Sequence, residues 1–406
     1  MARFGLIGHP LGHSCSPRVH ELLGGAGYQL MDTPPEALDD FLRARAFDGI
    51  NVTIPYKQAV IPYCDELGET AQKIGSVNTV VRRKDGTLFG DNTDAFGFLG
   101  MAQRAGIDFK GKKTLVLGSG GTSHTACAVI AAQGGTPVVI SRGGENNYDN
   151  LHLHGDAKLL VNTTPVGMYP HANEAPVDLQ KLPNLEGVLD VIYNPLRTRL
   201  LQQAQQMNLR CEGGLYMLCA QAARARELFT GEKIAAETLE KAYRTLLTER
   251  QNVVLIGMPG CGKTTVGKLL SQKTGLPLVD TDALIVEKAG KPIPQIFAEE
   301  GEGAFRDLEE SVIAQCCAAG GQIISTGGGA ILRETNRQNL RMNGRVAWIK
   351  RPLERLPFHG RPLSTGYAAV TELYAVRKPL YEACADFAVD NVSTPQQTAE
   401  EILNSI

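Results

Sequence analysis

The chain has 406 residues, more than one ordinary core accommodates, so about two or three domains are expected. Its 43% hydrophobic and 21% charged residues are typical of a globular protein, and a formal net charge of -2 gives no electrostatic reason to expect nucleic acid or an anionic membrane as a partner. No apolar run approaches the roughly 18 residues of a membrane helix. Nine cysteines without a C-x-x-C pair, and a start unlike a signal peptide, favour reduced thiols in the cytoplasm. Homo-oligomerisation stays open.

Short apolar runs alternate with helical patterns, which is typical of α/β architecture with largely parallel sheets. Strands are predicted in residues 2–8 and 48–57, the second leading into a loop. Residues 112–135 predict a strand, a glycine turn and a helix, and 137–142 and 157–168 predict two further strands. Apolar residues at helical spacing follow in 216–249, and 250–275 again predict strand, loop and helix. The charged segment 246–252 is the expected domain boundary.

The segment GSGGTS, residues 118–123, lies between a predicted strand and a predicted helix. Glycines at this point let the backbone approach a pyrophosphate at the helix N-terminus, so the segment is a variant of the dinucleotide-binding fingerprint. Roughly twenty residues on, where an NAD enzyme carries Asp or Glu, stand Ser141 and Arg142. Because arginine pairs with a 2′-phosphate, NADP(H) is favoured over NAD, although Glu145 stands nearby.

Polar residues on both sides of this loop form a recognisable series. GHPLGHSCSP contains Ser14 and Ser16, NVTIPYK contains Thr53 and Lys57, SVNT contains Asn78, and GDNTDA contains Asp94. NTTPVGM contains Thr163, Tyr193 follows, and GGLYMLCAQAA contains Gly214, Met217 and Gln221. In this order the motifs resemble the shikimate dehydrogenase family over residues 1–248.

The resemblance implies NADPH-dependent reduction of 3-dehydroshikimate to shikimate. Hydride addition to a ketone leaves an alkoxide that must gain a proton, and a lysine ammonium beside a carboxylate can supply it, so Lys57 and Asp94 are the expected catalytic pair. The implied substrate contacts are Ser14, Ser16, Thr53, Lys57, Asn78, Asp94, Tyr193 and Gln221. The implied NADP contacts are Gly118, Ser119, Gly120, Gly121, Thr122, Ser123, Ser141, Arg142, Thr163, Gly214 and Met217. The paired serines favour shikimate over quinate, and a quinate-preferring enzyme stays an alternative.

Three features depart from the family pattern. Ala95 stands where a glycine is usual, and Tyr216 replaces a small residue, where it is expected to crowd the nicotinamide end of the cofactor site. The segment between Arg142 and Asn162 is short, so at least one helix of the cofactor-binding domain is expected to be reduced. The adenine side of the cofactor is then expected to be open.

A second glycine-rich loop, GMPGCGKTT, follows the apolar run NVVLI. It fits the Walker A pattern, in which backbone N–H groups cradle phosphates, the lysine reaches the outer phosphates and the hydroxyl binds Mg²⁺. The chain has no N-K-x-D element of the kind that accompanies GTP, so ATP is expected. The expected ATP contacts are Gly257, Gly260, Cys261, Gly262, Lys263, Thr264, Thr265 and Arg361, with Cys261 filling a small-residue position.

The residues after this loop indicate the acceptor. PLVDTDALI contains Asp280 and Asp282, EGEGAFRDLE contains Arg306, ISTGGGAIL contains Gly328, GRPL contains Arg361 and VRKPLYE contains Arg377. Together they resemble the shikimate kinase family over residues 250–406. The resemblance implies that Asp280 and Thr264 hold Mg²⁺, partly through water, and that Asp282 orients the acceptor hydroxyl. It also implies that Arg306, Gly328 and Arg377 bind the substrate, and that Arg361 meets the transferring phosphoryl group.

The sequence therefore predicts a bifunctional shikimate-pathway enzyme that uses NADP(H), ATP and Mg²⁺. The expected domains are a substrate-binding domain, 1–93 plus 214–248, a shortened Rossmann-like domain, 94–213, and a P-loop kinase domain, 249–406. A regulatory protein built on degenerate copies of these domains is the alternative class. It is disfavoured because Lys57, Asp94, Lys263 and Asp282 are all present.

Overall fold

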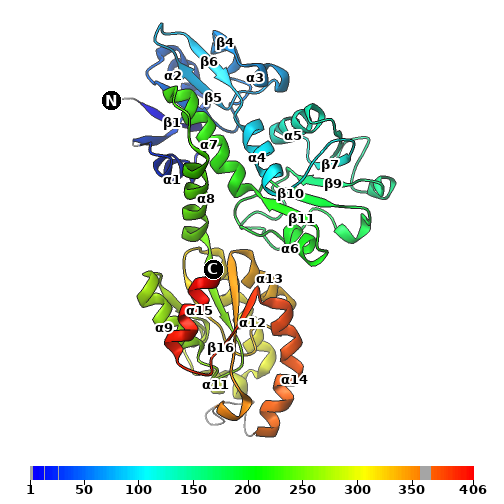
Figure 1. Ribbon diagram of the computed structural model, residues 1–406, viewed down its shortest axis with the longest axis vertical. Helices are drawn as coiled ribbons and strands as arrows, with labels where there is room; N and C mark the ends of the chain where they lie inside the picture. Colours follow the sequence, from blue (N-terminus) through cyan, green and yellow to red (C-terminus); the bar gives the residue numbers. More distant parts are fainter. Residues whose placement is uncertain (1–2, 13, 26, 357–366) are drawn as a thin grey trace. The chain divides into compact units, whose positions relative to one another are not determined.

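The computed structural model describes residues 3–12, 14–25, 27–356 and 367–406 (Figure 1). Contacts divide the chain into two compact units. Unit 1 comprises Met1–Tyr193 and Leu200–Leu247, and unit 2 comprises Asn194–Arg199 and Thr248–Ile406. The finer division of unit 1 into a substrate-binding and a cofactor-binding domain stays a prediction.

The first sheet of unit 1 is mixed, with strand order β2-β1-β3-β5-β6-β4. Strand β1 is parallel to β2 and β3, whereas β5 is antiparallel to β3 and β6. The antiparallel strand departs from the predicted parallel pattern because the connection 83–87 is too short for a crossover helix. The strands are β1 (Phe4–Gly8), β2 (Tyr28–Asp32), β3 (Gly49–Val52), β4 (Glu66–Leu67), β5 (Thr79–Arg82) and β6 (Leu88–Asp91). The helices are α1 (Ser16–Leu22), α2 (Leu38–Ala44) and α3 (Glu69–Ile74).

The second sheet of unit 1 is fully parallel, with order β11-β10-β9-β7-β8. Strands β7, β9 and β10 are almost continuous buried runs, as expected of strands covered on both faces. Helix α4 leads from the first sheet to the second, and α7 packs against it on the return (Figure 1). The strands are β7 (Lys113–Leu117), β8 (Thr136–Ile140), β9 (Leu159–Asn162), β10 (Gly187–Asp190) and β11 (Arg210–Gly213). The helices are α4 (Asp94–Arg104), α5 (Gly121–Ala132), α6 (Arg199–Gln206), α7 (Gly214–Thr230) and α8 (Ala236–Arg250).

Unit 2 is built on one parallel sheet with order β13-β14-β12-β15-β16. Helix α9 packs beside α15, and α12 packs beside α10, α11 and α13. The strands are β12 (Asn252–Ile256), β13 (Leu278–Asp280), β14 (Ile323–Ser325), β15 (Gly344–Lys350) and β16 (Phe387–Asp390). The helices are α9 (Lys263–Thr274), α10 (Thr281–Ala289), α11 (Ile293–Glu299), α12 (Gly301–Ala318), α13 (Glu334–Met342), α14 (Tyr367–Cys384) and α15 (Pro395–Ser405).

Each unit has its own hydrophobic interior. One cluster of buried residues fills unit 2 around β12, β14 and β15, and separate clusters fill unit 1 on the faces of its two sheets. All nine cysteines are free thiols. In the part of the chain that the structure describes, no helix is both long and apolar enough to cross a bilayer.

Candidate active sites

The predicted proton-transfer pair forms in unit 1. Lys57, which follows β3, places its ammonium 2.6 Å from a carboxylate oxygen of Asp94, the first residue of α4. The Asp94 side chain is 8% exposed and that of Lys57 is 23% exposed, so solvent reaches the lysine more readily than the carboxylate. A partly buried ammonium held by a carboxylate can give a proton to a substrate oxygen and then recover it.

Asn78 organises the polar surroundings of this pair. Its side-chain oxygen accepts a hydrogen bond at 2.7 Å from the backbone N–H of Thr93, directly before Asp94. Its amide nitrogen donates to the Gln221 side chain on α7 at 3.2 Å. The buried Asn78 amide thus links α7 to the start of α4. It joins two predicted substrate contacts, Asn78 itself and Gln221.

The two predicted carboxylate-binding serines also meet. The Ser14 hydroxyl donates to that of Ser16 at 3.1 Å and accepts the Ser16 backbone N–H at 3.2 Å. Thr53 follows β3 and Tyr193 follows β10, both at the carboxyl ends of strands, where α/β proteins place their ligands. Their substrate contacts stay predictions.

The first glycine-rich loop connects β7 to α5. Gly118 has φ +103°, in the left-handed region that favours glycine, and a Cβ there would lie 3.0 Å from the Thr163 hydroxyl oxygen. Thr163 donates to the Leu117 carbonyl at 2.6 Å and fixes this approach. Beside Gly120 and Gly121 the space is open to at least 4 Å, and α5 begins at Gly121. The loop therefore offers an accessible helix N-terminus, which suits a pyrophosphate. Ser119, Thr122 and Ser123 lie in the loop and the first turn of α5.

The connection between β8 and β9 contains little regular structure. The shortening of the cofactor-binding domain stays a prediction. Between β8 and β9 the only helical element in the described chain is a 3-10 helix, Leu151–His154. Side-chain bonds of Asn147 and Asn150 to nearby backbone groups hold the rest of this connection. Ser141 and Arg142 directly follow β8, and Arg142 is exposed. An exposed guanidinium at this strand end is available to a 2′-phosphate.

Tyr216 packs against the neighbouring helices α4 and α8. Its ring packs against α4 at Gly100, lies edge-on to Tyr243 of α8 at 5.3 Å between ring centroids, and is covered by the Arg104 guanidinium at 5.0 Å. The same first turn of α7 carries Gly214 and Met217, two of the predicted cofactor contacts. The tyrosine is accommodated because Gly100 leaves room for it on α4. The crowding of the nicotinamide end stays a prediction.

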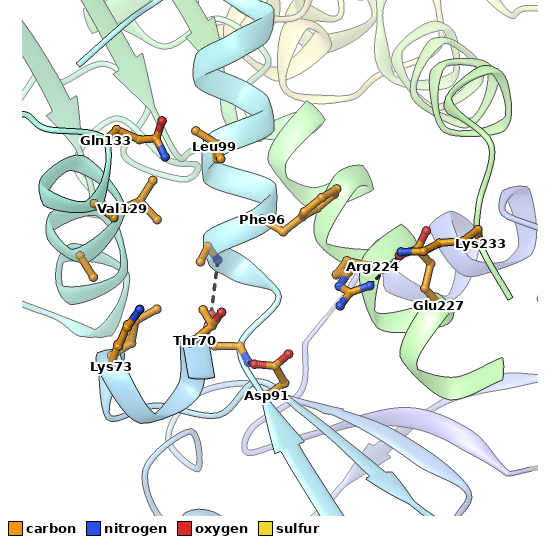
Figure 2. Close-up of a pocket in the computed structure, with 15 residues that line it drawn as sticks. Thr70, Lys73, Asp91, Phe96, Leu99, Val129, Gln133, Arg224, Glu227 and Lys233 are labelled. Carbon is orange, nitrogen blue, oxygen red and sulfur yellow. Dashed lines mark hydrogen bonds and ion pairs between the residues drawn. The ribbon is translucent and has the colours of Figure 1, made fainter. Parts of the chain in front are cut away.

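A separate cavity of about 580 Å³ lies beside α4, and none of the predicted site residues lines it (Figure 2). Phe96, half exposed, and Leu99 lie on α4 between Val129 of α5 and Arg224 of α7. Ala95, which stands in place of the family's glycine, also lines it. Three cationic and two acidic side chains border the cavity, and this mixture favours no one class of ligand.

In unit 2, the second glycine-rich loop joins β12 to α9. Gly257, Gly260 and Gly262 have φ of +144°, +81° and +105°, values that only glycine adopts without strain. Lys263 is buried, and its ammonium donates to the backbone carbonyls of Gly257 at 2.8 Å and Met258 at 3.1 Å. The ammonium and the converging backbone N–H groups form an anion-binding cradle.

Three residues next to this cradle suit a magnesium ion. The Thr264 hydroxyl donates to the Asp280 carboxylate at 2.9 Å and lies 3.2 Å from the Ser325 hydroxyl oxygen. The other Asp280 oxygen accepts the backbone N–H of Asp282 at 3.1 Å and caps α10. Mg²⁺ characteristically uses one or two protein oxygens and completes its shell with phosphates and water.

Cys261 and Thr265 complete the loop. Cys261 is buried, and its carbonyl accepts the Asn391 side-chain amide at 2.7 Å, so it fills a small-residue position as expected. Thr265 lies in the first turn of α9.

The three consecutive glycines each face a different part of the site. A Cβ on Gly327 would lie 2.5 Å from the Asp282 carboxylate, one on Gly328 2.5 Å from the Pro259 ring, and one on Gly329 2.6 Å from the Arg306 guanidinium. A side chain at any of the three positions would displace its neighbour, and at Gly328 that neighbour is the stiff Pro259 ring. One short backbone segment thus brings together the predicted acceptor carboxylate, the nucleotide loop and a substrate-binding arginine.

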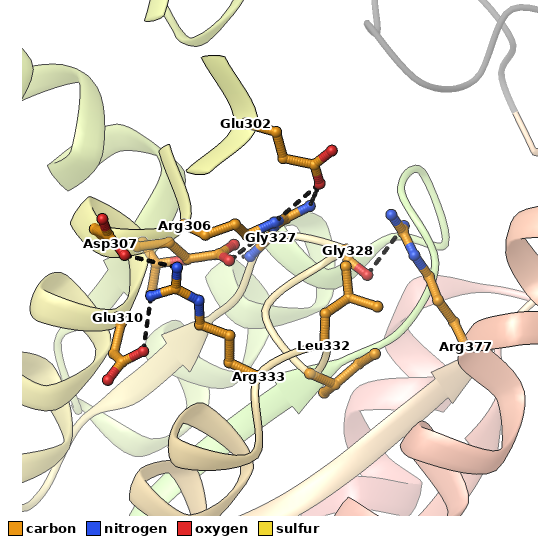
Figure 3. Close-up of polar contacts among 12 residues, drawn as sticks. Glu302, Arg306, Asp307, Glu310, Gly327, Gly328, Leu332, Arg333 and Arg377 are labelled. Carbon is orange, nitrogen blue, oxygen red and sulfur yellow. Dashed lines mark hydrogen bonds and ion pairs between the residues drawn. The ribbon is translucent and has the colours of Figure 1, made fainter. Parts of the chain in front are cut away.

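Two buried arginines border this segment (Figure 3). Arg306 donates to Glu309 at 2.8 Å and to Glu302 at 3.0 Å. Burial raises the pKa of Glu309, against the opposing effect of the Arg306 charge. Arg377 donates to the Gly328 carbonyl at 3.2 Å, while its Nε has no hydrogen-bond partner among the residues described. A guanidinium with a vacant buried donor suits a substrate carboxylate.

Sequence reasoning missed the residues that support this site, namely Glu309, Ser325, Tyr381 and Asn391. The three-residue spacing of Glu309 from Arg306 is a signal for their contact. The other three make their contacts across long sequence separations. Arg361 lies outside the described residues, so its role stays a prediction.

Two family models match the chain. One is the shikimate dehydrogenase substrate binding domain, over residues 6–80, and the other is shikimate kinase, over residues 259–406. The shikimate dehydrogenase (NADP(+)) of Shouchella clausii is 38% identical over 273 residues, which are 61% of this chain and 99% of that protein.

Solved dehydrogenase structures also align with part of this chain. The shikimate 5-dehydrogenase of Thermus thermophilus in complex with NADP(H) and shikimate aligns with a TM-score of 0.55 and 37% identity, over 60% of this chain and 99% of that one. Quinate dehydrogenase from Corynebacterium glutamicum in complex with NAD aligns with a TM-score of 0.55 and 30% identity, over 61% of this chain and 99% of that one.

Fold and sites together define a two-unit α/β enzyme, in which one unit carries a dinucleotide-type loop and the other a P-loop kinase site. The chain belongs to the shikimate dehydrogenase family, with a shikimate kinase domain in its C-terminal part. It is a bifunctional enzyme of the shikimate pathway, and the prediction from the motifs is confirmed.

Proposed function

We propose that unit 1 uses Lys57 and Asp94 to reduce 3-dehydroshikimate to shikimate with NADPH, and that unit 2 phosphorylates the 3-hydroxyl of shikimate with ATP. The 2.6 Å contact of Lys57 with Asp94 carries the first assignment. The three glycines that gather Asp282, Pro259 and Arg306 carry the second. The product of the first reaction is the substrate of the second.

In unit 1, NADPH supplies the hydride. The Lys57 ammonium donates a proton to the ketone oxygen as negative charge develops there, and Asp94 keeps the lysine oriented. Ser14 and Ser16 bind the carboxylate, while Asn78 and Gln221 hold ring hydroxyls. The exposed Arg142 after β8 supports NADP(H) over NAD.

In unit 2, ATP supplies the phosphoryl group, and Mg²⁺ neutralises its charge. Asp282 orients the acceptor hydroxyl and accepts its hydrogen bond. Arg306 and Arg377 bind the substrate carboxylate. Lys263, which donates to backbone carbonyls in this structure, would hold phosphate oxygens, and Thr264 and Asp280 would hold the metal.

We also propose a cytoplasmic location. The support is that all nine cysteines are free, and several of them are buried in the cores. This usage is typical of a reducing compartment.

Two single variants test the division of labour in one coupled assay with 3-dehydroshikimate, NADPH and ATP. Lys57→Ala is expected to lower NADPH oxidation at least about 100-fold and to leave phosphorylation of added shikimate intact. Lys263→Ala is expected to do the reverse, because it removes the cation that reaches the phosphates.

A folded variant that loses both activities contradicts the two-site assignment. The wild-type chain, assayed in the oxidative direction with shikimate and with quinate, tests the alternative substrate. A higher kcat/KM for quinate contradicts the assignment of unit 1.

A further inference from the structure

Tyr381 of α14 lies almost completely buried beside the substrate loop, the three glycines 327–329 of unit 2. Its side chain is 1% exposed, and its hydroxyl donates to the Gly328 carbonyl at 2.7 Å. The ring stacks on Trp348 of β15, with 5.6 Å between centroids and 18° between planes. Burial raises the pKa of Tyr381 above its usual value, so the hydroxyl keeps its proton and stays a donor.

The same carbonyl receives Arg377. Its guanidinium donates to the Gly328 oxygen at 3.2 Å, and Tyr381 is four residues further along α14, one turn away on the same face. A carbonyl oxygen has two lone pairs and accepts both donors. Gly328 therefore connects the tyrosine with the arginine that is proposed to bind the substrate carboxylate.

Gly328 is enclosed on another side by the nucleotide loop, because a Cβ there would collide with Pro259. A glycine has no side chain to anchor it, so its orientation depends on the groups that hold its peptide units. The bond from Tyr381 fixes the plane of the peptide that joins Gly328 to Gly329. Gly329 in turn lies against Arg306, so the placement of both arginines depends on this plane.

We propose that Tyr381 is a positioning residue of the kinase reaction: its hydroxyl holds the Gly328 backbone and Arg377 in the arrangement that receives shikimate. This inference rests on the proposed function of unit 2. The Tyr381 hydroxyl also lies 3.9 Å from the Met258 sulfur in the nucleotide loop, a much weaker contact than its 2.7 Å bond to Gly328. Its main effect is therefore expected on binding of the acid substrate.

The hydroxyl, and not the ring, carries this role. Phenylalanine at 381 would fill the same volume and keep the stack on Trp348. What it would remove is the buried hydrogen bond to the Gly328 carbonyl of the substrate loop, which is worth about a three- to tenfold change in an equilibrium constant, and a weak contact with the Met258 sulfur.

Tyr381→Phe tests the inference through two measurements on the full chain. In kinase assays, the KM for shikimate is expected to rise about three- to tenfold, while kcat and the KM for ATP stay within about twofold. Trp348 is the only tryptophan of the chain and contacts Tyr381, so a shikimate titration followed by its fluorescence reports on this site alone. The Kd from that titration is expected to rise by the same factor.

Two further variants are compared with Tyr381→Phe. Tyr374→Phe removes a hydroxyl from the same helix and is expected to change neither KM. Gly328→Ala forces a side chain against Pro259 and is expected to raise the KM for both shikimate and ATP.

The inference is overturned if Tyr381→Phe leaves the shikimate KM and Kd unchanged, or raises the ATP KM equally. A wild-type chain that does not phosphorylate shikimate overturns the proposed function of unit 2, and this inference with it. A normal wild type with an unaffected variant overturns the inference alone.

Discussion

Among single residues, Glu309 has the most consequential surroundings. Its side chain is 1% exposed, and a fully buried carboxylate is unfavourable unless a cation is close. Arg306 provides that cation at 2.8 Å, and the charges of Asp282 and Arg377 also act on its pKa. The residue therefore keeps the substrate-binding guanidinium in place without facing solvent itself.

Glu309→Gln is expected to raise the kinase KM for shikimate about tenfold, since Arg306 loses its buried charged partner. Glu302→Gln is the matched control, because Glu302 also binds Arg306 but is half exposed, where such pairs contribute little. The raised pKa adds a pH signature. As the pH falls, Glu309 takes up a proton at a higher pH than an ordinary glutamate, so the wild-type KM rises there and that of the Gln variant stays flat. Equal KM values for the two variants would contradict this role.

At the scale of elements, α4, α7 and α8 meet in one cluster. The Arg104 guanidinium lies 5.0 Å from the Tyr216 ring centroid and 4.3 Å from that of Tyr243, and it donates to Glu240 at 2.9 Å. Cation–π contacts and an ion pair at a partly buried site contribute more than they do in open solvent. The tyrosine that departs from the family pattern is thus part of the attachment of α8.

Tyr216→Ala is expected to destabilise unit 1 by about 1–3 kcal/mol, because the cluster loses its shared ring. The KM for NADPH is expected to stay within about twofold of the wild type. Chemical denaturation and steady-state kinetics measure the two quantities, and Tyr216→Phe, which keeps the ring, serves as control. A lower NADPH KM with unchanged stability would instead support the prediction that the ring crowds the cofactor.

Much of the fold and of the two candidate sites could be predicted from the sequence. The features that could not be predicted have physical causes. Glycine loops between a strand and a helix are local patterns, so both nucleotide sites could be read from short segments. A reduced β8–β9 connection is predicted from a count of residues. The place of Tyr216 could not be predicted, because it depends on the absence of a side chain at Gly100, more than one hundred positions away. The bond from Tyr381 to Gly328 likewise joins segments separated in sequence and exists only once α14 is packed.

At the scale of the whole molecule, each unit has its own sheets and its own buried clusters. Such units can unfold separately, and a ligand stabilises only the unit that binds it. The two nucleotide loops lie in different units.

Differential scanning calorimetry is therefore expected to resolve two transitions. NADP⁺ is expected to raise the midpoint temperature of one transition, and ATP with Mg²⁺ that of the other. A ligand at 100 times its Kd stabilises the unit that binds it by about 2.7 kcal/mol. Lys263→Ala should abolish the second shift and keep the first. One transition that responds to both ligands would contradict the independence of the units.

The attachment of α8 also decides where the gene could be divided. Tyr243 and Leu246, near the end of that helix, are buried in unit 1, and Tyr243 completes the cluster around Arg104. A stop codon placed before them would strip the reductase of part of its own interior. A separately produced reductase should therefore extend through Leu247, whereas a kinase fragment that begins at Thr248 lacks the segment Asn194–Arg199 of unit 2.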